Sequence, residues 1–180
     1  ATYSCVKNQY EVIFQNEDGT ELQRSNVTYG ETPKYNGATP TKAATAEFTY
    51  TFAGWTPAIT MVEGAQTYTA TYSSVKNQYE VIFQNEDGTE LQRSNVTYGE
   101  TPVYAGATPT KAATAEYTYT FAGWSPSITA VTGAQTYTAT FKATKRKYTL
   151  TAKPEDDAMG IVTGSGIYDY GTHVVVTETP

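Results

Sequence analysis

Cysteine and histidine, the side chains used most often in metal sites and in nucleophilic catalysis, are almost absent from this sequence. Its 180 residues contain one of each, Cys5 and His173. A single cysteine cannot form an internal disulfide, which excludes the class of small domains held together by disulfide bonds. A zinc site needs a cluster of such residues, and a Cys–His or Ser–His pair would have to join distant parts of the chain. The sequence therefore predicts no catalytic residues, no metal site and no cofactor, and hence not an enzyme.

Positive charge and long apolar runs are also scarce. The 12 Lys and Arg residues against 18 Asp and Glu residues give a net charge of −6, whereas binding to phosphates needs a basic surface. The one basic run, residues 142–147, is typical of a solvated linker. No apolar run approaches the roughly 18 residues of a membrane-spanning helix. We therefore expect no nucleic-acid partner and no membrane span in this segment.

A long internal repeat dominates the sequence. Residues 6–73 recur as residues 75–142, so that the period is 69 residues. A repeat of this length can bury a small core of its own, which predicts separate tandem domains rather than the thin units of a solenoid. Duplication increases length and valency and adds no new chemistry, which favours a structural or adhesive role. The two copies differ at nine of 68 aligned positions: Lys34/Val103, Asn36/Ala105, Phe48/Tyr117, Thr56/Ser125, Ala58/Ser127, Met61/Ala130, Glu63/Thr132, Tyr72/Phe141 and Ser73/Lys142.

A short match at the N-terminus sets the boundaries of the repeats. Residues 1–4 are identical to residues 70–73, the end of the first repeat, so we expect them to be the tail of an upstream copy. Cys5 stands where the second repeat has Ser74, which favours a neutral substitution. The predicted segments are the tail of an upstream repeat, two complete repeats and a divergent, truncated third repeat: residues 1–4, 5–73, 74–143 and 144–180.

Within each repeat, apolar residues alternate with polar ones, which is the pattern of half-buried β-strands. The first alternating segment, residues 10–15, ends at residues 16–19, whose Asp-Gly pair is a strong signal for a hairpin turn into a second strand. Residues 48–55 and 66–72 alternate in the same way. Between the two pairs of strands, residues 31–46 contain two prolines and predict a crossover with one helical turn. We therefore predict a mainly β fold, in which small β-grasp-like domains with mixed sheets follow one another end to end.

Large apolar side chains at the strand positions are the expected core. Two of the nine differences exchange Phe with Tyr, at positions 48/117 and 72/141. A hydroxyl group can be gained or lost only where the tip of the ring reaches water or a polar partner, so we expect these rings at the edge of the core. The predicted core residues are Val12, Phe14, Leu22, Phe52, Trp55 and Ile59 in the first repeat, and Val81, Phe83, Leu91, Phe121, Trp124 and Ile128 in the second.

Three features allow a second interpretation. The acidic turn at residues 16–18 is similar to a calcium loop but lacks its spaced ligands, so a hairpin turn is favoured. The threonines of residues 67–71 could form a ligand-binding row, although exposed strands favour threonine by shape alone. Trp55 and Trp124 could stack on sugars, although a Gly-Trp pair at the end of a strand more often closes a core.

The order of motifs in both repeats resembles the internalin-type B-repeat family of bacterial cell-surface proteins. The matching motifs are NEDGTEL, TYGETP, GATPTKAAT, the Gly-Trp strand YTYTFAGW and TYTATF. Residues 147–180 look like a divergent branch of the same family that ends before its Trp strand. The resemblance implies a compact β-grasp-like domain in a surface-attached or secreted adhesin-type protein outside the bacterial cell. It also implies a family without enzymatic activity.

Two functions are compatible with such an array. We expect a non-catalytic stalk or spacer, whose partners are the neighbouring repeats of the same chain. The alternative is a multivalent binding module for a host glycan or surface protein, with contacts in the loops at residues 34–36 and 56–63. Because a multivalent binder should keep its contact residues alike, the differences in these loops favour the spacer. The possible contact residues are Lys34, Asn36, Met61 and Glu63.

Overall fold

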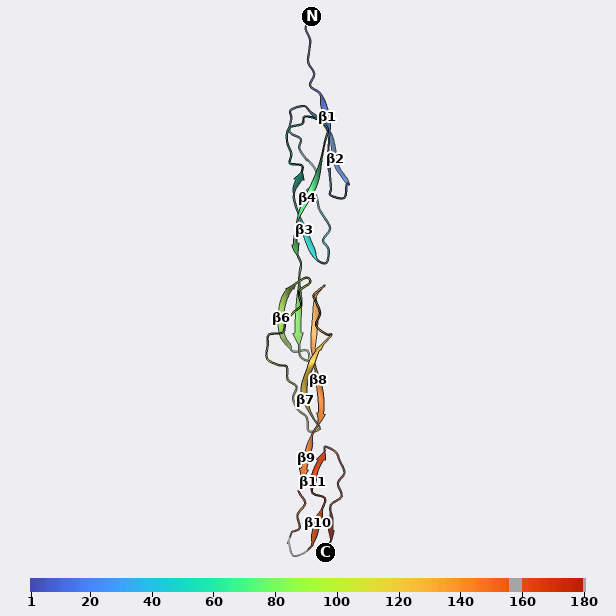
Figure 1. Ribbon diagram of the computed structural model, residues 1–180, viewed down its shortest axis with the longest axis vertical. Helices are drawn as coiled ribbons and strands as arrows, with labels where there is room; N and C mark the ends of the chain where they lie inside the picture. The colour runs from blue at the N-terminus through green and yellow to red at the C-terminus, as the bar shows by residue number, and fades with distance from the viewer. Residues whose placement is uncertain (156–159, 180) are drawn as a thin grey trace. The chain divides into compact units, whose positions relative to one another are not determined.

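A computed structural model describes residues 1–155 and 160–179, which contain strands and coil but no helix (Figure 1). The contacts divide the chain into two compact units. The first holds Ala1–Gln78 with Thr97–Gly99, and the second holds Tyr79–Val96 with Glu100–Pro180. Residues 156–159 and 180, which belong to the predicted third repeat, lie outside the described residues.

The first repeat forms a mixed four-stranded sheet with the strand order β2-β1-β4-β3. The hairpin strands β1 and β2 are antiparallel, as are β3 and β4, whereas the central strands β1 and β4 run parallel. The boundary predicted at residues 73/74 falls inside β4. The strands are β1 (Gln9–Gln15), β2 (Glu21–Thr28), β3 (Phe48–Thr56) and β4 (Gln66–Lys76).

The second repeat forms a sheet with the same order, β6-β5-β8-β7. The prediction of tandem, mainly β domains is therefore confirmed. The residues that follow form two strand pairs, β9 with β11 and β10 with β12, and none of those described after Ala139 is buried. The strands are β5 (Gln78–Gln84), β6 (Glu90–Thr97), β7 (Tyr117–Ser125), β8 (Gln135–Lys145), β9 (Lys147–Leu150), β10 (Ile161–Thr163), β11 (Gly166–Asp169) and β12 (Thr177–Thr179).

The core of each repeat sits on the two central strands. Alternate residues of a strand point to the same face, so Val12 and Phe14 of β1 lie beside Tyr68 of β4, and Val62 reaches them from a loop. These four side chains are buried, and a ring of half-buried residues packs around them: Tyr10, Val27, Tyr35, Trp55 and Ile59. The equivalent cluster of the second repeat is Val81, Phe83, Val131 and Tyr137, surrounded by Tyr79, Val96, Tyr104, Trp124 and Ile128.

Coil rather than a helix covers this core, so the prediction of a helical turn within residues 31–46 was wrong. Pro33 and Pro40 are both buried in this segment. Proline has no N–H group to donate and pushes the preceding residue toward an extended conformation, which breaks up any helix in so short a segment. The coil is fastened instead by backbone hydrogen bonds, from Gly30 N to Val62 O at 2.8 Å and from Val62 N to Glu31 O at 2.9 Å.

A β-bulge in β3 brings Trp55 to the core. The pairing with β4 shifts by one residue between Phe52 and Gly54, so that Ala53 has no opposite partner. Without this extra residue, Trp55 would point to the face opposite Phe52, because strand residues alternate with a period of two. The two rings are in fact 5.4 Å apart. Gly54 has φ of 128°, a backbone conformation that residues with a Cβ atom rarely adopt.

A second bulge accounts for a core prediction that was wrong. In the β1–β2 hairpin, Phe14 faces Gln23 and Gln15 faces Glu21, so Leu22 is the extra residue of β2. Leu22 is only half-buried and does not belong to the core cluster.

The difference between Tyr72 and Phe141 changes the hydrogen bonding of a nearby asparagine. The Tyr72 hydroxyl donates a hydrogen bond to Oδ1 of Asn16 at 2.5 Å, and burial raises the pKa of this hydroxyl, which favours its protonated, donating form. Phe141 has no hydroxyl, and Oδ1 of Asn85 is buried without a hydrogen-bond partner among the described residues. The ring tip at this position therefore reaches a polar partner, as the sequence predicted, and the second repeat lacks half of the pair.

Restoring the hydroxyl should stabilise the second repeat. Because an unsatisfied buried acceptor costs about 1–3 kcal/mol, we expect Phe141→Tyr to raise the free energy of unfolding of this repeat by about 1 kcal/mol. The matched change Tyr72→Phe should lower the stability of the first repeat by a similar amount. Urea unfolding followed by circular dichroism measures both. A Phe141→Tyr chain that is no more stable than the parent would contradict the pairing.

Trp55 should matter for its own repeat only. Its ring lies 4.8 Å from that of Phe14, and truncation of a large aromatic side chain in a core costs about 3–5 kcal/mol. Since Trp55 is half-buried, we expect Trp55→Ala to cost the first repeat about 3 kcal/mol. Trp124 then reports an unchanged transition of the second repeat by fluorescence. Loss of both transitions together, or of neither, is the contrary result.

Candidate functional site

The loop with variable residues 34 and 36 is held by a side-chain amide of the sheet. Gln23 Nε2 donates to the carbonyl oxygen of Lys34 at 2.8 Å, and the N–H of Asn36 donates to Gln23 Oε1 at 2.7 Å. Gln92 makes the same pair of hydrogen bonds with Val103 and Ala105, at 2.9 and 2.8 Å. Both bonds involve only backbone atoms of the loop, so its conformation does not depend on the side chains at these positions.

Tyr35, between the two variable positions, points the other way and joins the core. Its ring lies 5.4 Å from Phe14 and 4.9 Å from Trp55, and its hydroxyl donates to the carbonyl of Ala38 at 2.9 Å. A Cβ atom at Gly37 would collide with the Tyr35 hydroxyl, so the ring packs closely on the chain here. Lys34 and Asn36 are therefore exposed on either side of a fixed, half-buried anchor.

The second variable loop has the same design. Met61 is 61% exposed and Glu63 is exposed, whereas Val62 between them is 2% exposed. The backbone of Val62 holds the loop through its bonds with Gly30 and Glu31. Again the residues that differ between the repeats flank one that does not.

The structure does not gather the four predicted contact residues into one site. Met61 and Glu63 line a shallow hollow of about 200 Å³, whereas Lys34 and Asn36 do not. The equivalent hollow beside Ala130 measures about 100 Å³. Pockets for small molecules usually measure about 300–1,000 Å³, so neither hollow is large enough for a ligand of that kind.

The tryptophans belong to the core rather than to a sugar-binding surface. Around Trp55, the rings of Phe14, Tyr35 and Phe52 all lie within 5.4 Å and meet it edge to face. Phe14 is fully buried beneath it. Phe83 and Trp124 repeat this arrangement at 4.8 Å in the second repeat.

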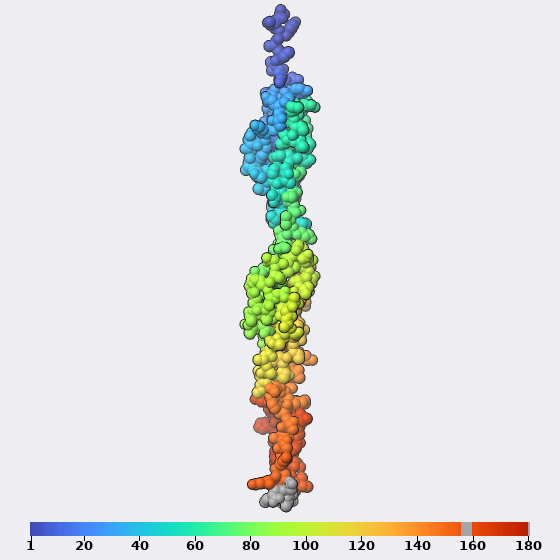
Figure 2. Space-filling model, turned by 90° about the vertical axis from the view of Figure 1, so that its left-hand side faces the viewer, coloured from blue at the N-terminus to red at the C-terminus, as the bar shows by residue number. Residues whose placement is uncertain are grey.

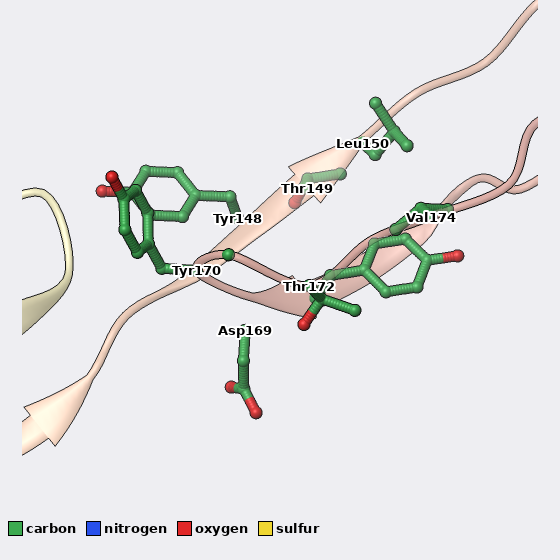
Figure 3. A pocket seen from close by; sticks show the side chains of 9 residues that line it. Tyr148, Thr149, Leu150, Asp169, Tyr170, Thr172 and Val174 are labelled. Atoms are coloured by element: carbon green, nitrogen blue, oxygen red, sulfur yellow. The ribbon is translucent and has the colours of Figure 1, made fainter.

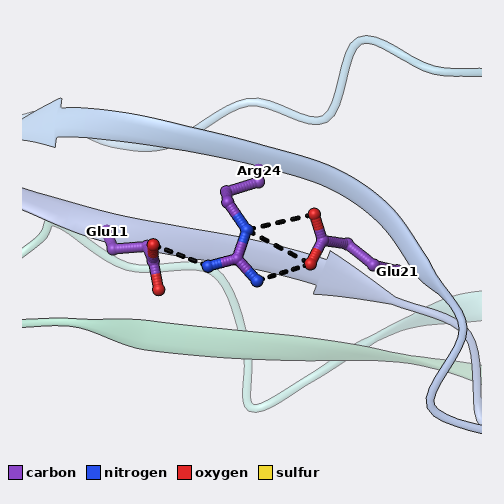
Figure 4. Close-up of polar contacts among 3 residues, drawn as sticks. All are labelled: Glu11, Glu21 and Arg24. Carbon is purple, nitrogen blue, oxygen red and sulfur yellow. Dashed lines mark hydrogen bonds and ion pairs between the residues drawn. The ribbon is translucent and has the colours of Figure 1, made fainter.

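Charged side chains of the β1–β2 hairpin pair with one another. Figure 4 shows Arg24 between two carboxylates, with Nη1 at 2.6 Å from Glu11 and Nη2 at 2.6 Å from Glu21. The hydrogen bonds from Arg24 hold the pKa of Glu21 below its ordinary value. Arg93 makes the same clamp in the second repeat. These groups are about half exposed, so solvent screens each clamp, which adds little to stability and mainly fixes the hairpin.

The acidic turn is a hairpin turn in the structure. Asn16 N donates to Thr20 O at 2.8 Å and Gly19 N to Asn16 O at 3.0 Å. Asp18 accepts from the N–H of Thr20 at 2.9 Å, and this bond lowers the pKa of Asp18. Among residues 1–155 and 160–179, no three His, Cys, Asp or Glu side chains lie close enough to hold a metal ion.

The threonine row of β4 is used within the sheet. Thr69 Oγ1 accepts a hydrogen bond from Gln15 at 3.1 Å, and Thr71 Oγ1 donates to the carbonyl of Gly54 at 2.9 Å. Both hydroxyls therefore already have partners in the fold.

A hollow larger than those beside the variable loops lies in the third, divergent segment and was not predicted. It measures about 420 Å³ and is open on one side, with the rings of Tyr148 and Tyr170 at one end and Val174 at the other (Figure 3). The two tyrosine rings are 6.2 Å apart. Asp169, its one lining carboxylate, is paired with Lys147 at 3.2 Å. The lining offers aromatic and apolar surface, and no periodic pattern in the sequence marks it.

Comparisons with known proteins find similarity among solved structures only. No family model and no curated protein matches the sequence. Among solved structures, the chain is similar to Streptococcal High Identity Repeats in Tandem (SHIRT) domains 3-4 from a cell surface protein, with 16% sequence identity and a TM-score of 0.36. The match covers 76% of this chain and 99% of that one. So distant a likeness carries no argument about function.

The described residues were also compared with the requirements of a membrane span. None of them forms a helix with the length and apolar character needed to cross a bilayer.

Removal of the amide that holds the first loop should cost more than changes in the loop itself. Gln23→Ala removes two hydrogen bonds, each worth about 1 kcal/mol, so we expect the first repeat to lose about 1–2 kcal/mol of stability. The control chain carries Lys34→Val and Asn36→Ala, the residues of the second repeat, and should stay within about 0.5 kcal/mol of the parent. Denaturant unfolding measures both chains. Equal effects would mean that the loop side chains, not Gln23, set its conformation.

Proposed function

We propose that the repeats are a non-catalytic spacer in an adhesin-type protein of the bacterial surface or secreted from the cell. One observation carries the proposal. In both loops, the side chains that differ between the repeats are exposed and the fold does not use them, whereas the residues that anchor these loops, Tyr35 and Val62, are the same in both copies. This is what we expect if the fold, and not a contact surface, is what the repeats must preserve.

The connection between the repeats also supports a spacer. β4 ends at Lys76 and β5 begins at Gln78, so a single residue, Asn77, joins the two sheets. The sequence resemblance to B-repeats of surface proteins is part of the same proposal, as is the absence of a catalytic step. A spacer needs stable domains, short connections and no chemistry of its own.

Small-angle X-ray scattering tests the proposal. A compact domain of this size has a radius of gyration of about 11 Å and a diameter of roughly 30 Å. If the repeats follow one another end to end, the 180 residues should have a maximum dimension of about 80–100 Å by the same scaling. A chain with one additional repeat should be longer by about one domain diameter. A maximum dimension of about 50 Å, that of a single globule of 180 residues, would reject the spacer.

The alternative is a multivalent binding module, and one observation favours it. Both variable loops have fixed backbones and outward side chains, which is the geometry of a surface that displays contact residues. A matched pair of chains separates the two functions. One is the parent chain. In the other, the first repeat carries the loop residues of the second, through the changes Lys34→Val, Asn36→Ala, Met61→Ala and Glu63→Thr. Binding to a glycan array that only the parent shows supports the module, and absence of binding by both supports the spacer.

A further inference from the structure

Asn77 binds a turn of the first repeat with its side-chain amide. Nδ2 donates to the carbonyl oxygens of Thr45 and Ala46, at 2.8 and 3.0 Å. Oδ1 accepts a hydrogen bond from the Thr49 hydroxyl at 2.7 Å. Both ends of the amide are therefore used, and all three partners lie in the turn that leads into β3 or at the start of that strand.

The backbone of Asn77 completes the contact. Its N–H donates to the carbonyl of Glu47 at 2.8 Å, and its carbonyl accepts from Tyr98 N at 2.9 Å. The turn itself is closed by two bonds between Thr45 and Phe48, from N to O at 2.8 Å and from N to Oγ1 at 2.9 Å. Three successive carbonyls, those of residues 45–47, thus point at one residue after β4.

The same turn of the second repeat is bound in the same way within the second unit. Arg146 stands 69 residues after Asn77. Its N–H donates to Glu116 O at 2.7 Å, its Nη1 to Thr114 O at 3.1 Å, and its carbonyl accepts from Tyr170 N at 2.9 Å. The Tyr148 hydroxyl donates to Ala115 O at 2.7 Å. A different side chain at the key position makes an equivalent contact, so this surface is a recurring part of the fold.

Asn8 is equivalent in position to Asn77 and Arg146. Unlike them, it contacts no Thr-Ala-Glu-aromatic turn among the described residues. It stands 69 residues before Asn77, and its carbonyl accepts from Tyr29 N at 2.8 Å, as the other two accept from Tyr98 and Tyr170. Its side chain is exposed and makes no hydrogen bond with the described residues. Tyr10 and Tyr29 lie beside it with ring centroids 6.4 Å apart, close to the 6.2 Å of Tyr148 and Tyr170.

The chain before Asn8 has nearly the same sequence as the end of β4, which is paired with β3. Residues 1–7 differ from residues 70–76 only at Cys5, and residues 72–76 pair with β3. Here residues 1–7 form no strand, and Figure 2 shows them leaving the first sheet as a single extended segment. Tyr3 and Val6 are 92% and 88% exposed.

We infer that Asn8, Tyr10, Tyr29 and residues 1–7 are a docking surface for one partner, a preceding repeat of this same type. Its Thr-Ala-Glu-aromatic turn binds the Asn8 amide, and its third strand pairs with residues 1–7. A second copy of this chain does not fit, because its own turns at residues 45–48 and 114–117 are already held by Asn77 and Arg146. The inference concerns what this surface binds and holds whether the array is a spacer or a binding module.

The test uses Cys5 as a natural reporter. We compare the 180-residue chain with an extended chain, in which a second copy of residues 1–69 precedes Ala1 and carries Cys5→Ser, the residue found at position 74. A nitroxide on the remaining cysteine reports the mobility of residues 1–7 by electron paramagnetic resonance. The spectrum should be fully mobile in the 180-residue chain and largely immobilised in the extended chain.

Substitutions at Asn8 then test the amide itself. In the extended chain, we expect Asn8→Ala to raise the mobile fraction at least about tenfold, since the three hydrogen bonds that the amide makes at the equivalent position 77 are lost. Asn8→Arg, the residue that the chain uses at position 146, should restore immobilisation. Asn77→Ala is the control and should leave this spectrum unchanged. In the 180-residue chain, Asn8→Ala should have no effect on the spectrum or on thermal unfolding.

Several results would overturn the inference. One is equal mobility of the label in both chains, and another is an extended chain in which Asn8→Ala changes nothing. Failure of the added repeat to fold, seen as no gain in cooperative unfolding amplitude from its tryptophan, also counts against it. In that chain the added copy is followed by the same residues as the first repeat, except for Cys5 in place of Ser74, so the proposed surface should complete it. None of these results depends on the overall dimensions that test the spacer.

Discussion

Each repeat depends on the contact between Phe14 and Tyr68, or Phe83 and Tyr137, across its two central strands. The rings stack at 5.1 and 5.2 Å, and all four side chains are almost completely buried. These strands are parallel neighbours, although most of the repeat separates them in the sequence. The stack therefore joins parts of the chain that are separated in sequence by the second strand, the crossover and the third strand. In a domain without a helix, it gives the coil of the crossover an apolar surface on which to pack.

The strands and the turn were predictable because their signals are local. Alternation of apolar residues marks β1, β3 and β4, and Asp18-Gly19 marks the hairpin turn that leads into β2. The core was predictable only in part. Val62 lies in a loop without any period, and Tyr68 lies in a threonine-rich strand that is typical of an exposed surface. Phe14 and Trp55 were expected in the core by size, but the alternation alone would have placed Trp55 on the wrong face. Only the bulge at Ala53, which depends on pairing with β4, brings Trp55 to the same face as Phe52.

The role of the docking residues could not be predicted from the sequence, for a different reason. Asn77 is a small polar residue between two strands, and its sequence context is typical of a solvated joint. Its partners at residues 45–49 lie about 30 positions earlier and are mostly backbone carbonyls, which carry no sequence signal. The change to Arg146 at the equivalent position hides the relation further. In contrast, the exposure of Lys34, Asn36, Met61 and Glu63 was predictable, because two copies that differ at a position report what the fold tolerates there.

The parallel pairing of β1 with β4 has a mechanical consequence. The chain enters the first repeat at the start of β1 and leaves it at the end of β4, and the two strands are hydrogen-bonded directly along Val12–Gln15 and Gln66–Thr69. Tension applied through the backbone at these two points pulls parallel neighbours in opposite directions along their length. The inter-strand bonds are then loaded in shear and must break together, rather than being peeled apart one after another as in a hairpin pulled from its open end. Resistance to such a force is set by the rate of unfolding and not by the free energy of unfolding, so even a domain this small can hold under load.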